Sequence, residues 1–263
     1  MQTDIDTLFG AGAHFGYTRA RRHPSALPFI FATRDQTDIF DLEETLKRLN
    51  AACDFITELS RTGGQILLVS GKNESLASVR EAAERIGVPF VAGRWIGGTL
   101  TNFKNIRKRI DRLQKLTAER ESGALEKYTK KERLLIDREI EELTARFGGV
   151  VTLEREPAAL VVVDTRAEMT AVREANQLGI PVVGLASSDC DFAMIKYPIP
   201  ANDTSVKAVR LIVGKLAEAY QEGKKMQPAR TAETVGSGGN VNLPPSHKAT
   251  EGHSKVKNDI VKS

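Results

Sequence analysis

The sequence predicts an α/β protein built on a parallel β-sheet that helices cover on both faces, with an antiparallel helical hairpin inserted into it. Short apolar runs alternate with amphipathic stretches of helical length, a pattern typical of βαβ units. Residues 102–148 interrupt this alternation with two apolar stripes at helical spacing. With 263 residues and 41% apolar side chains, the chain is able to bury a sizeable core.

The first part of the chain predicts a small hairpin followed by a long helix. FIFAT (29–33) and TDIFDL (37–42) are short apolar segments that flank a polar turn. EETLKRLNAACDFITELSRTG (43–63) follows with helical periodicity.

From residue 65 onward, strands and helices alternate on either side of the interruption. Gly87 ends the first of these helices, because glycine adopts the left-handed conformation of a helix C-terminus at little cost. The predicted strands are QILLVSG (65–71), VPFVAG (88–93), ALVVVDT (159–165) and IPVVGLAS (180–187). The predicted helices are ESLASVREAAERIG (74–87), AEMTAVREANQLG (167–179) and, after YPIP (197–200), TSVKAVRLIVGKLAEAYQEG (204–223).

The interruption predicts two helices that pack through their apolar stripes as an antiparallel coiled-coil hairpin. TKKE (129–132) has the Ser/Thr-x-x-Glu pattern that begins a helix, here the second one. The stripes are Phe103, Ile106, Ile110, Leu113 and Leu116 in the first helix, and Ile136, Ile140, Leu143 and Phe147 in the second.

These elements divide the chain into three parts. Residues 1–101 and 149–223 form the α/β body, and residues 102–148 form the hairpin arm. Residues 224–263 are rich in Gly, Ser, Asn, Pro and Lys and lack apolar periodicity, which predicts a disordered, weakly basic tail.

Charge and composition set only broad limits on function. Lys and Arg number 38 against 34 acidic residues, a mild excess whose placement matters more than its size. No apolar run approaches the roughly 20 residues of a membrane span, and no basic-then-apolar signal segment is present. We expect a cytoplasmic protein with reduced thiols at Cys53 and Cys190.

Signals for a nucleotide-binding enzyme are weak. VSGKNES follows a strand and precedes a helix, but a phosphate-binding loop would require glycine where Ile66 stands and Ser or Thr where Asn73 stands. GAGAHFG lacks the preceding strand of a dinucleotide-binding turn. We therefore expect Lys72 to be an exposed residue at a strand end.

Metal and nucleophile patterns are weak as well. Cys190 lies among carboxylates that raise the pKa of its thiol. Asp189 and Asp191 are able to coordinate a hard cation, although a solvated loop is the simpler interpretation. Asp164 stands at the carboxyl end of a strand, where it is either a catalytic acid or a cap for the next helix. No base partner is visible, so we expect no catalysis, no cofactor and no metal.

Two basic clusters are more informative. Residues 94–120 contain eight Lys and Arg residues against Asp111 and Glu119. At 100° per residue, Lys104, Lys108, Arg112 and Lys115 lie opposite the apolar stripe. Such a cationic ridge suits a phosphate backbone, and the backbone N–H groups of the preceding Gly-Gly-Thr-Leu-Thr-Asn segment are able to approach a phosphate.

The second cluster is TRARRHP (18–24), where arginines stand beside Tyr17 and His23. On a single amphipathic helix, charge on the outer face is equally well explained by contact with solvent. A lone tryptophan such as Trp95 is more typical of a hydrophobic core than of a ligand-binding surface. Two basic clusters, one of them on a projecting arm, favour RNA or phosphate binding over solvation.

Three segments, LFGAGAHFG (8–16), RWIGGTLTNFKNIR (94–107) and PAALVVVDTRAEMTAVREANQLGIPV (157–182), make the chain similar to the bacterial small-subunit ribosomal protein S-two family. The resemblance extends over about residues 5 to 223. It implies a flavodoxin-like doubly wound sheet carrying a coiled-coil hairpin.

The resemblance also implies a structural, non-enzymatic role in the small ribosomal subunit. The implied partners are 16S rRNA and neighbouring small-subunit proteins, including the large protein S-one, with no membrane and no small-molecule substrate. The alternative is a nucleotide- or sugar-phosphate-binding α/β enzyme. The residues expected to bind rRNA are Arg19, Arg21, Arg22, Arg94, Trp95, Asn102, Lys104, Arg107, Lys108, Arg109, Arg112 and Lys115.

Overall fold

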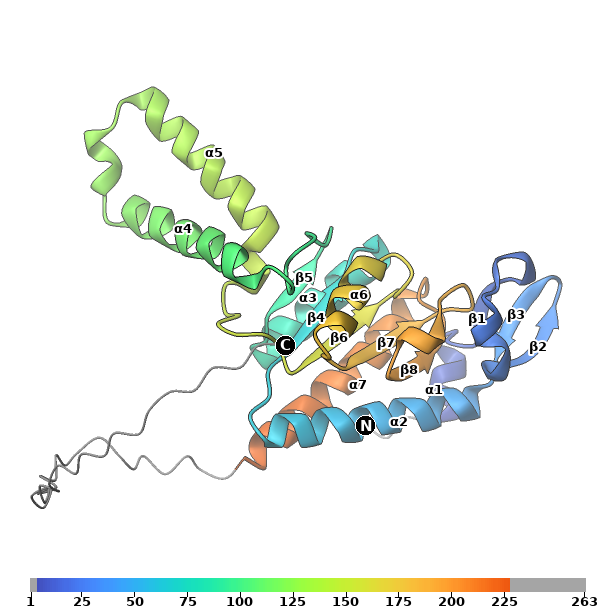
Figure 1. The fold of residues 1–263 in the computed structure, drawn as a ribbon. Coiled ribbons are helices and arrows are strands. Elements are labelled where there is room, and N and C mark those ends of the chain that lie inside the picture. The colour runs from blue at the N-terminus through green and yellow to red at the C-terminus, as the bar shows by residue number, and fades with distance from the viewer. Residues whose placement is uncertain (1–3, 228–263) are drawn as a thin grey trace, which may run out of the picture. The chain divides into compact units, whose positions relative to one another are not determined.

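A five-stranded parallel sheet forms the centre of the computed structural model, which describes residues 4–227 without the side chain of residue 126 (Figure 1). Its strands run in the order β5-β4-β6-β7-β8, and every neighbouring pair is parallel. This is the 2-1-3-4-5 order of flavodoxin-like sheets. The strands are β4 (Ile66–Ser70), β5 (Phe90–Ala92), β6 (Ala159–Val163), β7 (Val182–Ala186) and β8 (Tyr197–Pro200).

The four predicted strands are confirmed, and the segment YPIP adds a fifth, β8. Its two prolines cannot donate hydrogen bonds to a ladder, so proline-rich segments are found at sheet edges. β8 lies at such an edge, with β7 as its one neighbour in the sheet.

Helices cover both faces of this sheet, as predicted. Alternate strand residues enter opposite cores: Leu68 and Val161 pack with one set of helices, whereas Leu67 and Val162 pack with the other. The first core includes α1 (Ile5–Gly10), α2 (Leu42–Arg61), α3 (Asn73–Ile86) and α7 (Val206–Lys225). The second core includes α6 (Met169–Gln177), α4 (Phe103–Glu121) and α5 (Lys130–Phe147).

A smaller antiparallel sheet, in the order β1-β3-β2, packs near the N-terminus. The predicted hairpin is confirmed as β2 (Ile30–Arg34) and β3 (Thr37–Phe40), and β1 (Phe15–Thr18) is an additional strand. Asp35 and Gln36 turn the hairpin with φ values of 47° and 64°. Two consecutive positive φ angles are typical of the two-residue turns that match strand twist. Short 3₁₀ turns occupy Arg19–Arg21, Pro24–Phe29, Ala124–Lys127, Gly148–Val150 and Phe192–Met194.

The predicted interruption of the sheet consists of α4 and α5, which leave the body together (Figure 1). Their apolar stripes face inward: Ile110 and Leu116 of α4 and Ile140 of α5 are at most 3% exposed. The predicted cap of α5 is confirmed, because the Glu132 backbone N–H donates to Thr129 Oγ1 and the Glu132 carboxylate accepts from the Thr129 backbone N–H.

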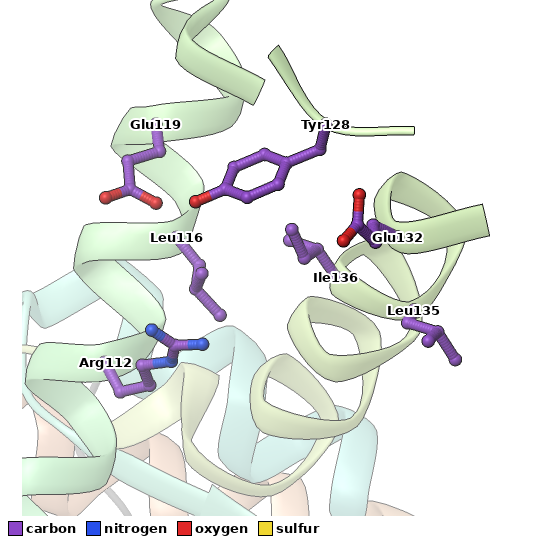
Figure 2. Close-up of a pocket in the computed structure, with 7 residues that line it drawn as sticks. All are labelled: Arg112, Leu116, Glu119, Tyr128, Glu132, Leu135 and Ile136. Atoms are coloured by element: carbon purple, nitrogen blue, oxygen red, sulfur yellow. The ribbon is translucent and has the colours of Figure 1, made fainter. Parts of the chain in front are cut away.

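Toward the connection between the helices, the interhelical space holds a cavity of about 320 Å³. Figure 2 shows Tyr128 of the connection pointing across it toward Glu119, with Leu116 and Ile136 at its base.

Helix α7 crosses α2 at close range. Ser60 Oγ donates to the Tyr220 carbonyl at 2.7 Å, and Gly223 approaches so closely that a β-carbon there would lie 2.2 Å from the Thr57 carbonyl oxygen. α7 ends at Lys225 and so includes the first two residues of the predicted tail, whose residues 228–263 lie outside the described part of the chain.

We expect Gly223→Ala to lower the free energy of unfolding by about 1–3 kcal/mol, because the added methyl group forces α2 and α7 apart. Gly214→Ala, in the same helix with open space around its Cα, is the matched control and is expected to be neutral or stabilising by up to about 1 kcal/mol. Urea unfolding of both variants measures the difference, and equal stability of the two would contradict the close crossing of α2 and α7.

Candidate nucleic-acid interface and the carboxyl edge of the sheet

The loop that leads from β5 into α4 is organised around one carboxylate, that of Glu174 in α6. Trp95 Nε1 donates to Glu174 Oε1 at 3.0 Å, and the Gly98 N–H donates to the same oxygen at 2.8 Å. The Leu100 N–H, the Thr101 N–H and the Thr101 hydroxyl donate to Oε2 at 3.0, 3.2 and 3.2 Å. The prediction that these N–H groups meet a phosphate is wrong in this conformation, because an internal anion already accepts from them.

These hydrogen bonds outweigh the cost of burying the carboxylate. Burial by itself raises the pKa of Glu174, but the bonds from Trp95 and the loop favour the charged form, and the pKa falls below its ordinary value. Trp95 is 7% exposed and belongs to the core, so its ring is not presented for stacking on a base. Asn102, the residue before α4, is exposed, and its side chain makes no capping hydrogen bond.

Of the six predicted cations of α4, four are exposed and have no partner on another element of the described chain: Lys104, Lys108, Arg109 and Lys115. The first three have no ion pair with any residue of the described range. Lys115 Nζ lies 3.9 Å from Glu119 Oε1 on its own helix, at the limit of an ion pair between exposed groups. These side chains retain charge that is available to a partner.

Two other predicted cations of α4 are used internally. Arg107 pairs with Asp111 at 2.9 Å and donates to the Leu153 carbonyl at 3.2 Å. Arg112 makes two hydrogen bonds, of 3.1 and 3.2 Å, with the carboxylate of Glu139 in α5. Arg112 therefore faces α5, whereas the helical projection placed it on the outer ridge. It lies at the border of that ridge, where a carboxylate of the neighbouring helix is within reach.

The arginines of the N-terminal cluster differ in the same way. Arg22 pairs at 3.3 Å with Asp38, which is fully buried. The Arg21 guanidinium lies 4.1 Å from the centre of the Tyr17 ring and pairs with Asp189 at 3.0 Å.

Arg19 and Arg94 are exposed, and neither makes an ion pair with the residues described. Arg94 lines a cleft beside Gly71 and Glu168. The structure thus separates the twelve predicted residues into open cations, internally paired cations and a buried tryptophan, with Asn102 exposed at the start of α4.

Lys72 is the central residue at the carboxyl edge of the sheet, and its prediction as an exposed residue is wrong. Its side chain is 15% exposed. Nζ lies 3.0 Å from Asp203 Oδ2 and 3.3 Å from Asp164 Oδ2, and it donates to the Tyr17 hydroxyl at 2.9 Å. The sequence offered no sign of this cluster, because its members come from four separate segments that meet only after folding.

The charges in this cluster depend on one another. Burial, and secondarily the charge of the nearby Asp164 carboxylate, raises the pKa of Asp203 to about 6 against the opposing effect of Lys72. Burial alone would lower the pKa of Lys72, but the Tyr17 and Asp203 contacts outweigh it and the pKa is raised. The prediction of Asp164 as a cap of the next helix is wrong, because α6 begins at Met169 and its N-cap is Glu168. Asp164 instead holds the turn before α6: its Oδ1 accepts from the Ala167 N–H at 3.0 Å, and its φ is 63°.

The predicted loop at 187–192 is built of internal contacts. Asp189 pairs with Arg166 at 2.7 Å as well as with Arg21. Burial is the main reason that the pKa of Cys190 rises to about 12, with the charges of Asp164 and Asp189 contributing less. Within residues 4–227, no three His, Cys, Asp or Glu side chains gather as metal ligands do. Every helix of that range is too short or too polar to span a lipid bilayer.

Fold and site together define an α/β protein with a five-stranded parallel sheet and open cations on helix α4. Comparison with known families gives the particular one: the model of the family described as Ribosomal protein S2 matches residues 8–223, and the chain belongs to that family. The family resemblance found in the sequence is thereby confirmed.

Curated relatives named "Small ribosomal subunit protein uS2" support the assignment. The protein of Coprothermobacter proteolyticus is 44% identical over 221 residues, covering 84% of this chain and 82% of the relative. The protein of Roseiflexus sp. is 42% identical over 231 residues, with 88% of each chain covered. The protein of Syntrophobacter fumaroxidans is 42% identical over 218 residues, covering 83% of this chain and 80% of the relative.

Membership of this family makes the chain a structural protein of the small ribosomal subunit, which in bacteria is a cytoplasmic particle. The family is not enzymatic, so the alternative of a nucleotide- or sugar-phosphate-binding enzyme is wrong.

We expect Glu174→Ala to lower the free energy of unfolding at pH 7 by about 3 kcal/mol or more, because several buried donors lose their acceptor. Glu174→Gln is expected to cost less, since one acceptor oxygen remains. The carboxylate has a lowered pKa, so its contribution is present above the unfolded value of 4.5 and is lost as pH falls through the folded pKa. Urea unfolding at pH 7 and pH 3 measures this, and a Gln variant whose deficit is the same at both pH values would contradict it.

We expect Lys72→Met to be destabilised more at pH 8 than at pH 5. The pKa of Asp203 is raised from 3.8 in the unfolded chain to about 6 in the folded chain. The free energy of unfolding therefore falls as pH rises from 3.8 through about 6. Without Lys72 the pKa of Asp203 rises further, and the loss of stability at pH values above this pKa becomes larger. The double variant Lys72→Met/Asp203→Asn removes the unpaired charge and is expected to recover part of the stability at pH 8. A double variant no more stable than Lys72→Met would show that Asp203 is not the cause.

Proposed function

We propose that this chain binds 16S rRNA through the outward cations of α4, as a structural constituent of the small ribosomal subunit. The observation that carries the proposal is the ridge formed by Lys104, Lys108 and Lys115, with Arg109 nearby on the same helix, whose charges are largely unused within the described chain. Neutralising phosphates with such charges releases counterions and supplies most of the affinity for a nucleic-acid backbone. Arg19 and Arg94 extend the open set on the body.

We infer that residues 102–148 form a coiled-coil arm on a body made of residues 1–101 and 149–223. The buried stripes of α4 and α5 and the Arg112–Glu139 bridge between the two helices support this division. The arm presents its cations away from its apolar seam, which suits contact with a phosphate backbone lying along α4.

Neighbouring small-subunit proteins, including the S-one protein, are the protein partners in this proposal. Exposed aromatic side chains near the N-terminus favour a protein contact there: Phe9 is 62%, Phe15 48% and Phe31 76% exposed. Exposed apolar side chains of this size that gather on one part of a protein are typical of interaction sites.

The charge-reversed variant Lys104→Glu/Lys108→Glu/Lys115→Glu is expected to leave the small subunit in salt that retains the wild-type chain. For each phosphate that the variant no longer neutralises, the slope of log affinity against log salt is expected to fall by about 0.7–0.9. Sucrose-gradient sedimentation measures the fraction of chain that migrates with small subunits.

A matched control carries the same charge change outside the arm, as Lys196→Glu/Lys207→Glu/Lys224→Glu. These three side chains are exposed and have no ion pair within residues 4–227. The control is expected to stay bound. Retention of both variants in high salt would refute the ridge as the contact.

A further inference from the structure

A cleft of about 440 Å³ opens at the carboxyl ends of β4 and β6. β5, which follows β4 in the chain, lies on one side of β4, and β6, which follows the arm, lies on the other side. The cleft therefore lies where the strand order of the sheet reverses direction. Open α/β sheets bind ligands at such points. The side chains and backbone that matter here are those of Gly71, Arg94, Trp95, Gly97, Glu168 and Thr170.

Glu168 is the unusual member of this cleft. It is 6% exposed, yet its carboxylate has no hydrogen bond and no ion pair with any residue between 4 and 227. Burial, and secondarily the charge of Asp164, raises its pKa to about 7. The carboxylate oxygens are not fully enclosed, because the cleft leaves them accessible. The hydrogen bonds that they lack within the chain therefore come from the cleft, from solvent or from a ligand.

Two glycines of the cleft, Gly71 and Gly97, leave space around this carboxylate because they have no side chain. Glu168 Oε1 lies against Gly71, where a β-carbon would be 2.3 Å from it, and nothing approaches within 4 Å of a β-carbon built on Gly97. Arg94 and Thr170 line the same cleft and are exposed, so a cation and a hydroxyl are available beside the carboxylate.

The ionised form, which predominates above the pKa of about 7, only accepts hydrogen bonds, so a partner of this form must donate them. Guanine carries two adjacent donors, N1–H and the N2 amino group, which match the two oxygens of a carboxylate. Adenine and cytosine place a ring acceptor beside their amino group, and uracil places its single N–H between two carbonyls. RNA-binding proteins read unpaired bases on this edge and contact phosphates with arginine.

We propose that this cleft binds a guanine nucleotide, with N1–H and N2–H donating to Glu168 and Arg94 neutralising the phosphate. The inference rests on the proposed rRNA-binding function when the guanine is an unpaired residue of the small-subunit RNA. A free guanine nucleotide has the same chemistry and is the second source.

The test with free nucleotide uses the fluorescence of Trp95, the one tryptophan of the chain, which lines the cleft. At pH 8, where Glu168 is mostly ionised, we expect GMP to change the emission of the full chain and AMP to bind at least tenfold more weakly. Glu168→Gln is expected to weaken GMP binding at least tenfold, and the exposed control Glu84→Gln is expected to leave it unchanged. Gly71→Ala, which displaces the carboxylate, is a second variant should Glu168→Gln fail to fold.

The test with RNA uses kethoxal, which reacts with N1 and N2 of accessible guanines. In small subunits that carry the wild-type chain, we expect one guanine of 16S rRNA to be protected from kethoxal. In subunits that carry Glu168→Gln, the same guanine is expected to react. GMP-specific quenching supports the free nucleotide as ligand, and the kethoxal difference supports an rRNA guanine. Equal binding of AMP and GMP overturns the cleft proposal. So does the absence of both the fluorescence change and the kethoxal difference while the wild-type chain still sediments with subunits. Either outcome leaves rRNA binding intact. Loss of the wild-type chain from subunits would instead refute the proposed function.

Discussion

The placement of the cationic helix depends on the buried carboxylate of Glu174. This one side chain, supplied by α6, accepts hydrogen bonds from an indole, three backbone N–H groups and a hydroxyl of the segment that precedes α4. The segment has no regular structure of its own, so these bonds hold it in place against the body. Because α4 begins directly after this loop, the same bonds determine where the open cations of α4 begin.

The carboxyl edge of the sheet shows how a fold associated with ligand binding serves a structural role. Part of the carboxyl edge, where ligands bind in other proteins of this architecture, is filled here by Lys72, its two aspartates and Tyr17. Arg21 and Arg166 neutralise Asp189 next to them. The N-terminal segment is thus tied to the sheet by ion pairs and hydrogen bonds. The neighbouring cleft keeps the Glu168 carboxylate without a partner among residues 4–227, which illustrates that function resides in sites and not in the fold.

Internal pairing decides which basic residues keep a charge that is available to a partner. Arg22, Arg107 and Arg112 have carboxylate partners within the chain, whereas Lys104, Lys108 and Arg109 have none within residues 4–227. Mutation of a paired arginine therefore perturbs the fold first, and mutation of an open lysine perturbs recognition first. A count of basic residues along the sequence does not distinguish the two groups.

The sequence by itself determined the strands β4, β5, β6 and β7, the long helices, the apolar stripes of α4 and α5 and the cap at Thr129, because each follows from residues close together in the chain. Its motifs also identified the family. Only the tertiary structure decided that Lys72 is buried, that Arg112 faces Glu139, and that Glu174 occupies the N–H groups expected to meet a phosphate. The physical reason is that charge pairing and burial depend on groups brought within about 3 Å by folding, and their separation along the chain gives no sign of that distance.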